Sequence, residues 1–416
     1  MLSHLLHRRL VNRQLKQKAL NTPFFGFALW TILLCILSLA PSRLSATHIV
    51  GGEVTYTCLG QNADGSSNFE VQMTIFRDCF NGNPNAFFDQ PASIGIFDQN
   101  NNLLTNLGTN GQLLIPFDTL LNDTLDPVLS NPCLVVPPTV CVHTTFYLDT
   151  ITLPFRQGGY LLAYQRCCRN RTILNIVNPL ASGATFSVRI TEQALNECNS
   201  SAKFTEWPPI YICSFEPIDF DQGAIDPDGD SIVYKLCTPL LGADQVNPRP
   251  QPPNNPPYDS VVWNSPPYGL SNMLNSDPNT GEVLRINPET GFLTGIPNTV
   301  GQFVVCICLD VYRVGSSIST TLRDFLYYVG LCNKTVSSFF APLIQCDSLT
   351  VSFENQSENA NSYEWYFNDP GQPGLVSSDP NPTFTFSDTG RYTVMLIADP
   401  NTVCVDTSFR EVYLQF

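Results

Sequence analysis

The chain has 416 residues and is acidic, with a formal net charge of −15 at pH 7, and it contains 33 prolines and 15 cysteines. A charge of this sign is repelled by nucleic acid and by anionic membrane surfaces, so the composition excludes proteins that depend on either as a partner. The length predicts two to four domains, each large enough to bury its own core.

The first 46 residues have the layout of a secretory signal peptide. Residues 1–23 carry five basic side chains and no acidic ones, an apolar run follows at 24–40, and a Leu-Ser-Ala segment at 44–46, which ends in two small residues, comes after Pro41. This order predicts export and removal of residues 1–46. The alternative is a retained membrane anchor, but the run is shorter than the about 20 apolar residues that span a bilayer. Cleavage removes six basic residues and leaves 15 basic against 36 acidic ones, a net charge of −21. We therefore expect an extracellular or cell-surface protein.

Cysteine usage supports export. One of the 15 cysteines, Cys35, lies in the signal segment, which leaves an even number, 14, in the exported chain. Even counts in an exported chain predict paired disulfides, which a reducing cytoplasm rarely preserves. A zinc site is disfavoured, because neither Cys306 and Cys308 nor Cys167 and Cys168 have the two-residue gap typical of such sites.

The segment 47–196 is predicted to be an N-terminal β domain. Residues 53–58 and 68–76 alternate apolar and polar side chains on either side of a turn at 61–65, which is the pattern of a β-hairpin. Further strands are expected at 145–153, 159–165 and 184–191.

The cysteines of this segment leave several pairings open. Cys58 and Cys79 lie at the far ends of the hairpin arms and are disulfide candidates, although their pairing depends on the strand register. Cys133 and Cys141 flank an apolar segment and are expected to close a small loop.

The segment 197–335 is predicted to be an immunoglobulin-like or cadherin-like β-sandwich. It opens with two further disulfide candidates, Cys198 and Cys213. A proline-rich insert at 247–257 must form an irregular loop, since proline cannot sustain a strand ladder, whereas 301–312 alternates and is expected to be a long strand. Many short strands separated by turn residues favour β-sandwiches. The fold class predicted for the chain is therefore all-β, with tandem immunoglobulin-like β-sandwich domains.

The segment 336–416 is predicted to be the smallest domain, with an immunoglobulin-like plan. Strands are expected at 349–353, 362–367, 380–386 and 391–397, and a tight turn precedes the last of them. The most distinctive residues of this plan are 351–353 (Val-Ser-Phe), 363–365 (Tyr-Glu-Trp), 381–386 and 390–394.

Through these residues the third segment resembles the PKD domain, a β-sandwich common in bacterial surface proteins. The turn that is usually Gly-Asp-Gly in that family is replaced here by Asn-Asp-Pro-Gly at 368–371. The resemblance implies that the first strand and a late strand bring Cys346 and Cys404 together. A disulfide between these two cysteines is the first that we expect.

The rest of the exported chain carries further resemblances. The Asp-Pro-Asp-Gly-Asp run at 226–230 and the segment 290–301 resemble immunoglobulin-like or cadherin-like domains. From its start at 47–53, the exported chain is similar to large multidomain surface proteins of gliding Bacteroidota, many of which use the type IX export route and end in a sorting domain. No such domain follows the last expected strand before Phe416, so we expect either a longer natural protein or another means of retention.

The strongest candidate site is a group of carboxylates in the second segment. Asp226, Asp228 and Asp230 alternate in a loop, with Asp219 and Asp221 just upstream. Hard oxygen ligands converging in a loop are what Ca²⁺ requires, so these five residues predict a structural calcium site. The alternative is an ordinary turn, because Asp and Gly are favoured in turns. An EF-hand is excluded, because the twelfth position of the loop is a cysteine and not the bidentate Glu.

No catalytic constellation stands out. The Ile-Val-Gly-Gly segment at 49–52 resembles the start of trypsin-like proteases, but only His48 and His143 remain after cleavage, and Ser231 lacks the glycines that should follow a nucleophile. No pair of carboxylates stands out as a glycosidase site. The aromatic residues predict either a sugar-stacking face or ordinary core packing; they are Trp207, Tyr258, Trp263 and Tyr268.

These features predict an exported cell-surface protein that acts in adhesion or scaffolding, tied to gliding or surface attachment, without catalysis of its own. The expected partners are cell-surface or extracellular proteins or polysaccharides, with no nucleic acid and with membrane contact only during export. The one expected cofactor is structural Ca²⁺. The alternative is a carbohydrate-binding accessory region of a larger secreted hydrolase, which depends on analogy at the level of the fold.

Overall fold

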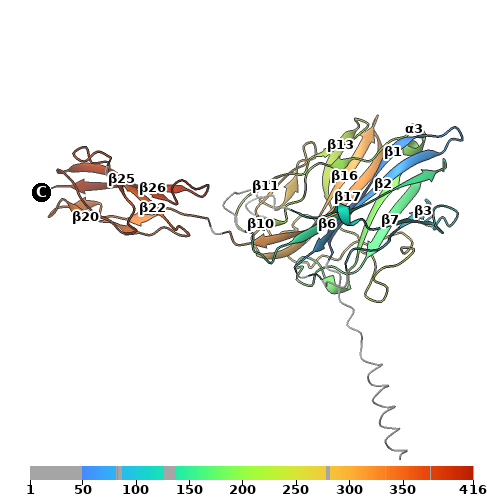
Figure 1. Ribbon diagram of the computed structural model, residues 1–416, viewed down its shortest axis with the longest axis horizontal. Helices are drawn as coiled ribbons and strands as arrows, with labels where there is room; N and C mark the ends of the chain where they lie inside the picture. The colour runs from blue at the N-terminus through green and yellow to red at the C-terminus, as the bar shows by residue number, and fades with distance from the viewer. Residues whose placement is uncertain are drawn as a thin grey trace, which may run out of the picture. The chain divides into compact units, whose positions relative to one another are not determined.

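The structure is a computed structural model that describes residues 49–80, 82, 87–125, 136–277, 282–332, 334–374 and 376–415. The predicted signal segment and Cys133 lie outside the described residues. Within the described ranges nearly every regular element is a β-strand, and the longest helix is the six-residue α3 (Glu192–Glu197). The predicted all-β class, with β-sandwich domains in series, is thus confirmed (Figure 1). No helix in those ranges has the length and apolar character needed to cross a bilayer.

Twelve strands form one large sheet in residues 49–332, which we call the N-terminal body (Figure 1). Nine of them follow the order β4-β3-β7-β8-β17-β1-β2-β6-β5; β10 and β16 pair with β17, and β13 pairs with β16. The alternating segments expected to form a hairpin are β1 and β2, which pair in antiparallel register. The strands of this sheet are β1 (Ile49–Gln61), β2 (Ser67–Asp78), β3 (Ala92–Phe97), β4 (Gln112–Ile115), β5 (Asn122–Thr124), β6 (Val142–Leu153), β7 (Tyr160–Arg166), β8 (Ala184–Ile190), β10 (Tyr211–Cys213), β13 (Ser231–Cys237), β16 (Gly301–Arg313) and β17 (Ser316–Gly330).

The predicted boundary between segments 47–196 and 197–335 does not separate two domains, so this part of the prediction is wrong. β17, from the second segment, pairs with both β1 and β8 from the first. Gly51 permits β1 to approach β17, because a Cβ at this position would collide with the backbone oxygen of Asp324. Period-two alternation shows which residues form strands and which face they share, but it does not show which strands pair.

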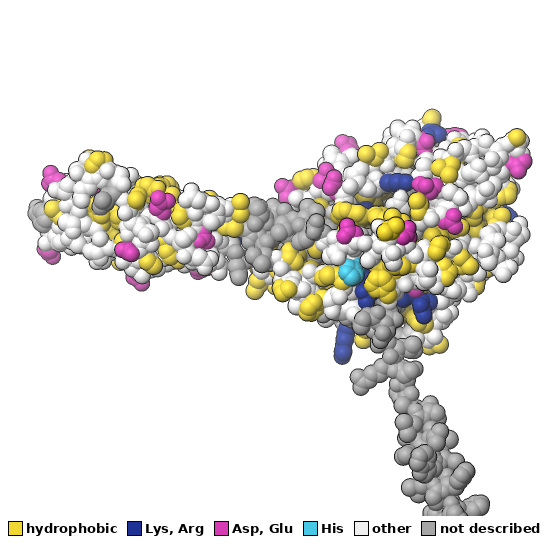
Figure 2. Space-filling model, in the orientation of Figure 1, with side chains coloured by type: hydrophobic (Ala, Val, Ile, Leu, Met, Phe, Trp, Pro, Cys, Tyr) yellow, Lys and Arg dark blue, Asp and Glu magenta, His cyan; other side chains and the backbone are white. Residues whose placement is uncertain are grey.

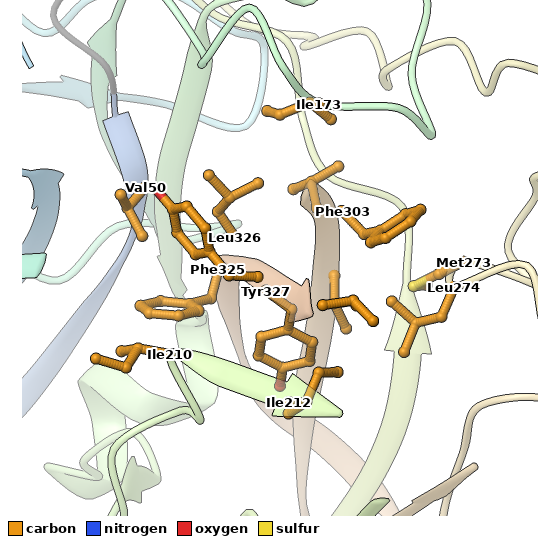
Figure 3. Close-up of a cluster of buried hydrophobic side chains, with 14 of the residues drawn as sticks. Val50, Ile173, Ile210, Ile212, Met273, Leu274, Phe303, Phe325, Leu326 and Tyr327 are labelled. Carbon is orange, nitrogen blue, oxygen red and sulfur yellow. The ribbon is translucent and has the colours of Figure 1, made fainter. Parts of the chain in front are cut away.

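The core of the N-terminal body draws side chains from both sides of that boundary. Val50 of β1 belongs to the same buried cluster as Phe325 and Tyr327 of β17 (Figure 3). The ring of Phe76 on β2 packs edge-on against Phe325, with ring centroids 5.0 Å apart. Burying one such side chain contributes about 1.5–3 kcal/mol. Neither segment could therefore fold alone without exposing this cluster to water.

Disulfides join five pairs of cysteines among the described residues. The pairs are Cys58 with Cys198, Cys79 with Cys141, Cys167 with Cys168, Cys213 with Cys332 and Cys237 with Cys308. Because Cys141 is bonded to Cys79, the loop expected between Cys133 and Cys141 is wrong. The cysteines named as candidates, Cys58, Cys79, Cys198 and Cys213, are all bonded, but Cys58 is not bonded to Cys79, because the register of the hairpin places them at opposite ends, and Cys198 is not bonded to Cys213. Cys306, Cys346 and Cys404 are free thiols.

The C-terminal domain, residues 335–415, is a β-sandwich. Among the described residues its strands pair only with one another, around a core that contains Trp365, Phe353 and Phe367. Trp365 is fully buried, and its Nε1 donates a hydrogen bond to the carbonyl of Asp379 (2.9 Å). The strands are β18 (Phe339–Phe340), β19 (Ile344–Gln345), β20 (Thr350–Ser352), β21 (Glu354–Asn355), β22 (Tyr363–Tyr366), β23 (Val376–Ser377), β24 (Thr383–Thr385), β25 (Gly390–Ala398) and β26 (Asp406–Leu414).

The disulfide expected between Cys346 and Cys404 is wrong. β19, which directly precedes Cys346, pairs in parallel with the end of β26, with Ile344 opposite Tyr413. Cys404 lies just before the other end of the same strand. Nine residues of extended strand separate the two positions by about 30 Å. A disulfide requires Cα atoms within about 7 Å of each other.

Candidate metal centre

The acidic loop, residues 226–230, joins β12 (Ala224–Ile225) to β13. Asp226 shapes the turn, since its Oδ1 accepts hydrogen bonds from the backbone N–H groups of Asp228 (3.0 Å) and Asp230 (3.1 Å). Gly229 has φ of +78°, a left-handed conformation that glycine adopts without strain. Each of the three Asp residues has a carboxylate oxygen within 4.8 Å of the others. The turn that Asp226 shapes is therefore also what brings the three carboxylates together.

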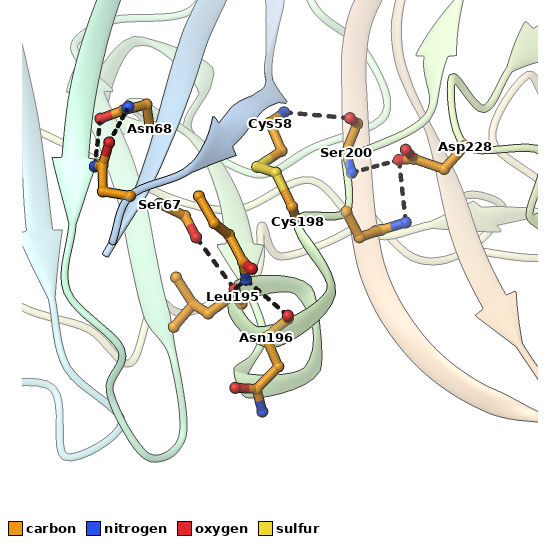
Figure 4. Close-up of a disulfide and its surroundings, with 11 residues drawn as sticks. Cys58, Ser67, Asn68, Leu195, Asn196, Cys198, Ser200 and Asp228 are labelled. Atoms are coloured by element: carbon orange, nitrogen blue, oxygen red, sulfur yellow. Dashed lines mark hydrogen bonds between the residues drawn. A yellow bond between two sulfur atoms is a disulfide. The ribbon is translucent and has the colours of Figure 1, made fainter. Parts of the chain in front are cut away.

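Two residues that follow α3 in the sequence, Asn199 and Ser200, contact this loop. The backbone N–H of Ser200 donates to Asp228 Oδ2 (2.6 Å; Figure 4). The Nδ2 of Asn199 donates to the same oxygen (3.1 Å) and to Asp230 Oδ2 (2.7 Å). Both residues directly follow Cys198, which caps the end of α3 and is bonded to Cys58 of β1. The helix end and the disulfide thus fix the segment that contacts the loop.

One arginine neutralises part of the cluster. Arg313, the last residue of β16, donates from Nε to Asp230 Oδ1 (2.7 Å) and from Nη2 to Oδ2 of the same carboxylate (2.8 Å). Its Nη1 donates to Glu197 Oε2 (2.8 Å). These hydrogen bonds raise the pKa of the guanidinium and lower the pKa of Glu197. With one cation against four carboxylates, the three Asp residues and Glu197, the group keeps a formal charge of −3.

Asp226 has the least favourable surroundings for a charge. Burial raises the pKa of its carboxyl, and the charges of Asp230 and Asp228 raise it further, against the opposing effect of the two backbone hydrogen bonds. Among the described residues, Asp226 Oδ2 has no hydrogen-bond partner, and neither has Asn199 Oδ1, although both residues are at least nine-tenths buried. A buried oxygen without a partner costs about 1–3 kcal/mol. A divalent cation bound through oxygen atoms would satisfy these groups and offset the repulsion between the carboxylates.

Asp219 and Asp221 do not belong to this cluster, so the prediction of five converging Asp residues is wrong for these two. Both lie on β11 (Ile218–Asp221) with exposed side chains, and β11 pairs with β15 (Phe292–Gly295) in a separate sheet. Asp221 Oδ1 accepts a hydrogen bond from the backbone N–H of Gly223 (2.8 Å), as in an ordinary turn. Sequence reasoning missed Asn199, Ser200 and Arg313, because no local pattern links them to the loop.

The four aromatic residues that could have formed a sugar-stacking face are packed into the N-terminal body. Tyr268 is buried, and Trp207 and Trp263 pack against the main core cluster. The hydroxyl of Tyr258 donates to the carbonyl of Asn254 (3.1 Å). Of the two roles considered for these four aromatic residues, ordinary packing therefore agrees with their positions.

The solved structures that are similar to this chain match it with low TM-scores. No protein-family model matches the chain, and no curated protein matches it. Among solved structures, it is similar to the PKD1 domain of Vibrio anguillarum Epp, at 27% identity and a TM-score of 0.17, over 20% of this chain and 96% of that one. It is also similar to the PKD1 domain of the Vibrio cholerae metalloprotease PrtV (24% identity, TM-score 0.17, 20% and 99% coverage). Protocadherin gammaB7 EC3-6 covers more of the chain (11% identity, TM-score 0.24, 88% and 93% coverage).

Proposed function

We propose that this chain is an exported protein of the cell exterior that acts in adhesion or scaffolding through β-sandwich modules and catalyses no reaction. The observation that carries the proposal is the disulfide network of the N-terminal body. Cys58 and Cys198 are 140 residues apart and Cys213 and Cys332 are 119 residues apart, yet each pair is bonded. Bridges of this kind persist in oxidising compartments and are rare in the cytoplasm.

We also propose that the acidic loop binds a structural Ca²⁺. The ligands available are Asp226 Oδ2 and Asn199 Oδ1, which lack partners among the described residues, together with Asp228. Bound there, the ion would tie the loop to the end of α3 and stiffen one end of the sheet. A stiff, disulfide-bonded body suits a protein that presents binding surfaces away from the cell.

On the sequence resemblance alone, we place this role at the envelope of gliding Bacteroidota. The test is a deletion strain assayed for attachment to surfaces and for gliding, complemented either with the whole gene or with a gene lacking residues 1–46. We expect the deletion to reduce attachment and only the whole gene to restore it. Protease treatment of intact cells should digest the protein before any cytoplasmic marker. Normal attachment by the deletion strain, or protection of the protein inside intact cells, would contradict the proposal.

A further inference from the structure

The outer side of the five-stranded sheet in the C-terminal domain carries a row of aromatic and aliphatic side chains, some exposed and some half-buried. In β25 and β26 alternate residues such as Val394 and Val412 are buried in the core, so the residues between them face outward. Tyr366 of β22 stands opposite Met395 of β25, and Met395 stands opposite Phe409 of β26. Val376 of β23 continues the row on the other side of Tyr366. One row of side chains thus crosses four strands.

A second exposed group lies four residues further along β26. Tyr413 pairs there with Ile344 of β19 on one side and with Arg391 of β25 on the other. Phe409 is 61% exposed and Ile344 is 53% exposed, which are high fractions for side chains of this size. We call the two groups together the aromatic face; its members are Ile344, Tyr366, Val376, Met395, Phe409 and Tyr413.

The opposite outer side of the sandwich is different. The exposed residues of β20 and β24 all carry hydroxyl groups, and they pair across the strands, Thr350 with Thr385 and Ser352 with Thr383. On the side in view in Figure 2, hydrophobic side chains gather on the surface of this domain among scattered acidic ones. Exposed apolar patches on a monomer frequently mark binding sites. The contrast between the two outer sides indicates that the aromatic face has a ligand.

Polar groups lie at fixed positions beside the rings of the aromatic face. The hydroxyl of Tyr366 donates to Glu364 Oε1 (2.8 Å). Arg391 forms an ion pair with Glu411, and its guanidinium lies over the ring of Tyr413, 5.2 Å from the ring centroid. Flat apolar rings are therefore flanked by groups that can both donate and accept hydrogen bonds.

The size of the face argues against a folded protein as the occupant. Strands about 4.8 Å apart and residues about 3.4 Å apart give the sheet an area of about 20 Å by 20 Å, roughly 400 Å². A stable protein–protein interface buries about 800 Å² on each partner. The aromatic face supplies only about half of that area.

Charge argues against a second copy and against anionic polymers. Residues 336–416 contain ten acidic and only two basic residues, and the whole chain has a net charge of −15. Two copies brought face to face, or a polyanion laid on this sheet, would be repelled. A neutral ligand has no such penalty.

We propose that the aromatic face binds a neutral polysaccharide. The apolar C–H faces of the sugar rings would stack on Tyr366, Phe409 and Tyr413, while the sugar hydroxyls would bond to Glu364, Arg391 and Glu411. An extended chain can cross the sheet along the row from Val376 to Phe409, which a narrow linear polymer can follow and a folded domain cannot. The inference names a ligand for the adhesive role proposed above and rests on that role for its biological meaning.

The test is native gel electrophoresis of the purified chain in gels cast with soluble neutral polysaccharides: hydroxyethylcellulose, glucomannan, arabinoxylan, laminarin and dextran. Retention on insoluble chitin and cellulose is measured in parallel. The variant combines Tyr366→Ala, Phe409→Ala and Tyr413→Ala. The matched control combines Thr350→Ala and Thr385→Ala on the opposite outer side. Phe409→Tyr keeps an aromatic ring and serves as the conservative variant.

We expect at least one polysaccharide to retard the wild-type chain, the triple variant to bind at least tenfold more weakly, and the control and Phe409→Tyr to bind as the wild type. The thermal midpoint of each variant checks its folding, which should be preserved because none of the three side chains belongs to the buried core cluster of the domain. No retardation by any polysaccharide would overturn the inference, and so would unchanged binding by the triple variant. A wild-type dimer in sedimentation that the triple variant abolishes would assign the face to a second copy instead. Attachment of the deletion strain is measured separately, so failure of the adhesive role is distinguishable from failure of this site.

Discussion

Removal of the Cys58–Cys198 disulfide tests how the N-terminal body is held together. In the double variant Cys58→Ser and Cys198→Ser, the unfolded chain regains the freedom that the bridge had removed. The bridge spans 140 residues, of which the nested Cys79–Cys141 bridge spans 62, so the loop that it closes has an effective length of 78 residues. Closing a loop of this length corresponds to about 4.5 kcal/mol at 25 °C. We expect the free energy of unfolding to fall by that amount.

Equilibrium unfolding in urea, followed by tryptophan fluorescence and far-ultraviolet circular dichroism, measures this change. Cys346→Ser removes an exposed free thiol and is the control for the substitution itself, so it should leave the free energy of unfolding unchanged. Because Asn199 directly follows Cys198, the double variant should also bind Ca²⁺ more weakly in calorimetric titration. A fall of less than about 1 kcal/mol, with the other disulfides intact by mass spectrometry, would refute the reasoning.

Four further predictions follow from charged and thiol groups. Asp226→Asn should abolish stabilisation by Ca²⁺, which amounts to about 2.7 kcal/mol at 100 times the dissociation constant, whereas Asp219→Asn should preserve it. Because folding raises the pKa of Asp226, the metal-free protein should become more stable as the pH falls through that raised pKa toward the ordinary value of an Asp carboxyl, and Asp226→Asn should remove this trend in urea unfolding. Glu53→Gln leaves the buried Arg323 without its ion-pair partner and should cost about 3–5 kcal/mol in the same assay. Cys346 should react with a maleimide in the native, unreduced protein; failure to react would indicate a disulfide instead.

The sequence predicts strands well where they are half-buried, because burial of one side enforces alternation. Residues 53–58 and 68–76 are read correctly for this reason, and they pair as β1 and β2. The same alternation carries no information about pairing between distant segments. β1 and β17 are separated by more than 250 residues, and their close approach depends on Gly51, which nothing in the sequence distinguishes from the other glycines of the chain. The large sheet that unites both segments could not have been inferred.

Of the candidate site, too, the sequence predicts one part and not the other. Asp226, Asp228 and Asp230 are contiguous, so one turn brings them together and the sequence suffices to find them. Asn199, which contacts the loop, directly follows Cys198, and the bond of Cys198 to Cys58 helps to hold this segment; disulfide connectivity does not follow from cysteine spacing. The aromatic face was equally hidden, since alternation in β26 does not show which of its two sides is covered.

The arrangement of partners around the acidic loop sets the affinity expected for Ca²⁺. Arg313 occupies both oxygens of Asp230, which removes that carboxylate from the ligands. Asp226 Oδ2, Asn199 Oδ1 and Asp228 remain, so the protein supplies about three oxygens where Ca²⁺ takes six to eight, and water must supply the rest. Sites with few charged ligands bind weakly, at dissociation constants of about 10⁻⁴–10⁻³ M, which is the range of extracellular modules. Replacing Arg313 with Met, a neutral side chain of similar length, frees Asp230 and should tighten binding at least tenfold in calorimetric titration. Weaker or unchanged binding would show that Arg313 organises the site and does not compete with the ion.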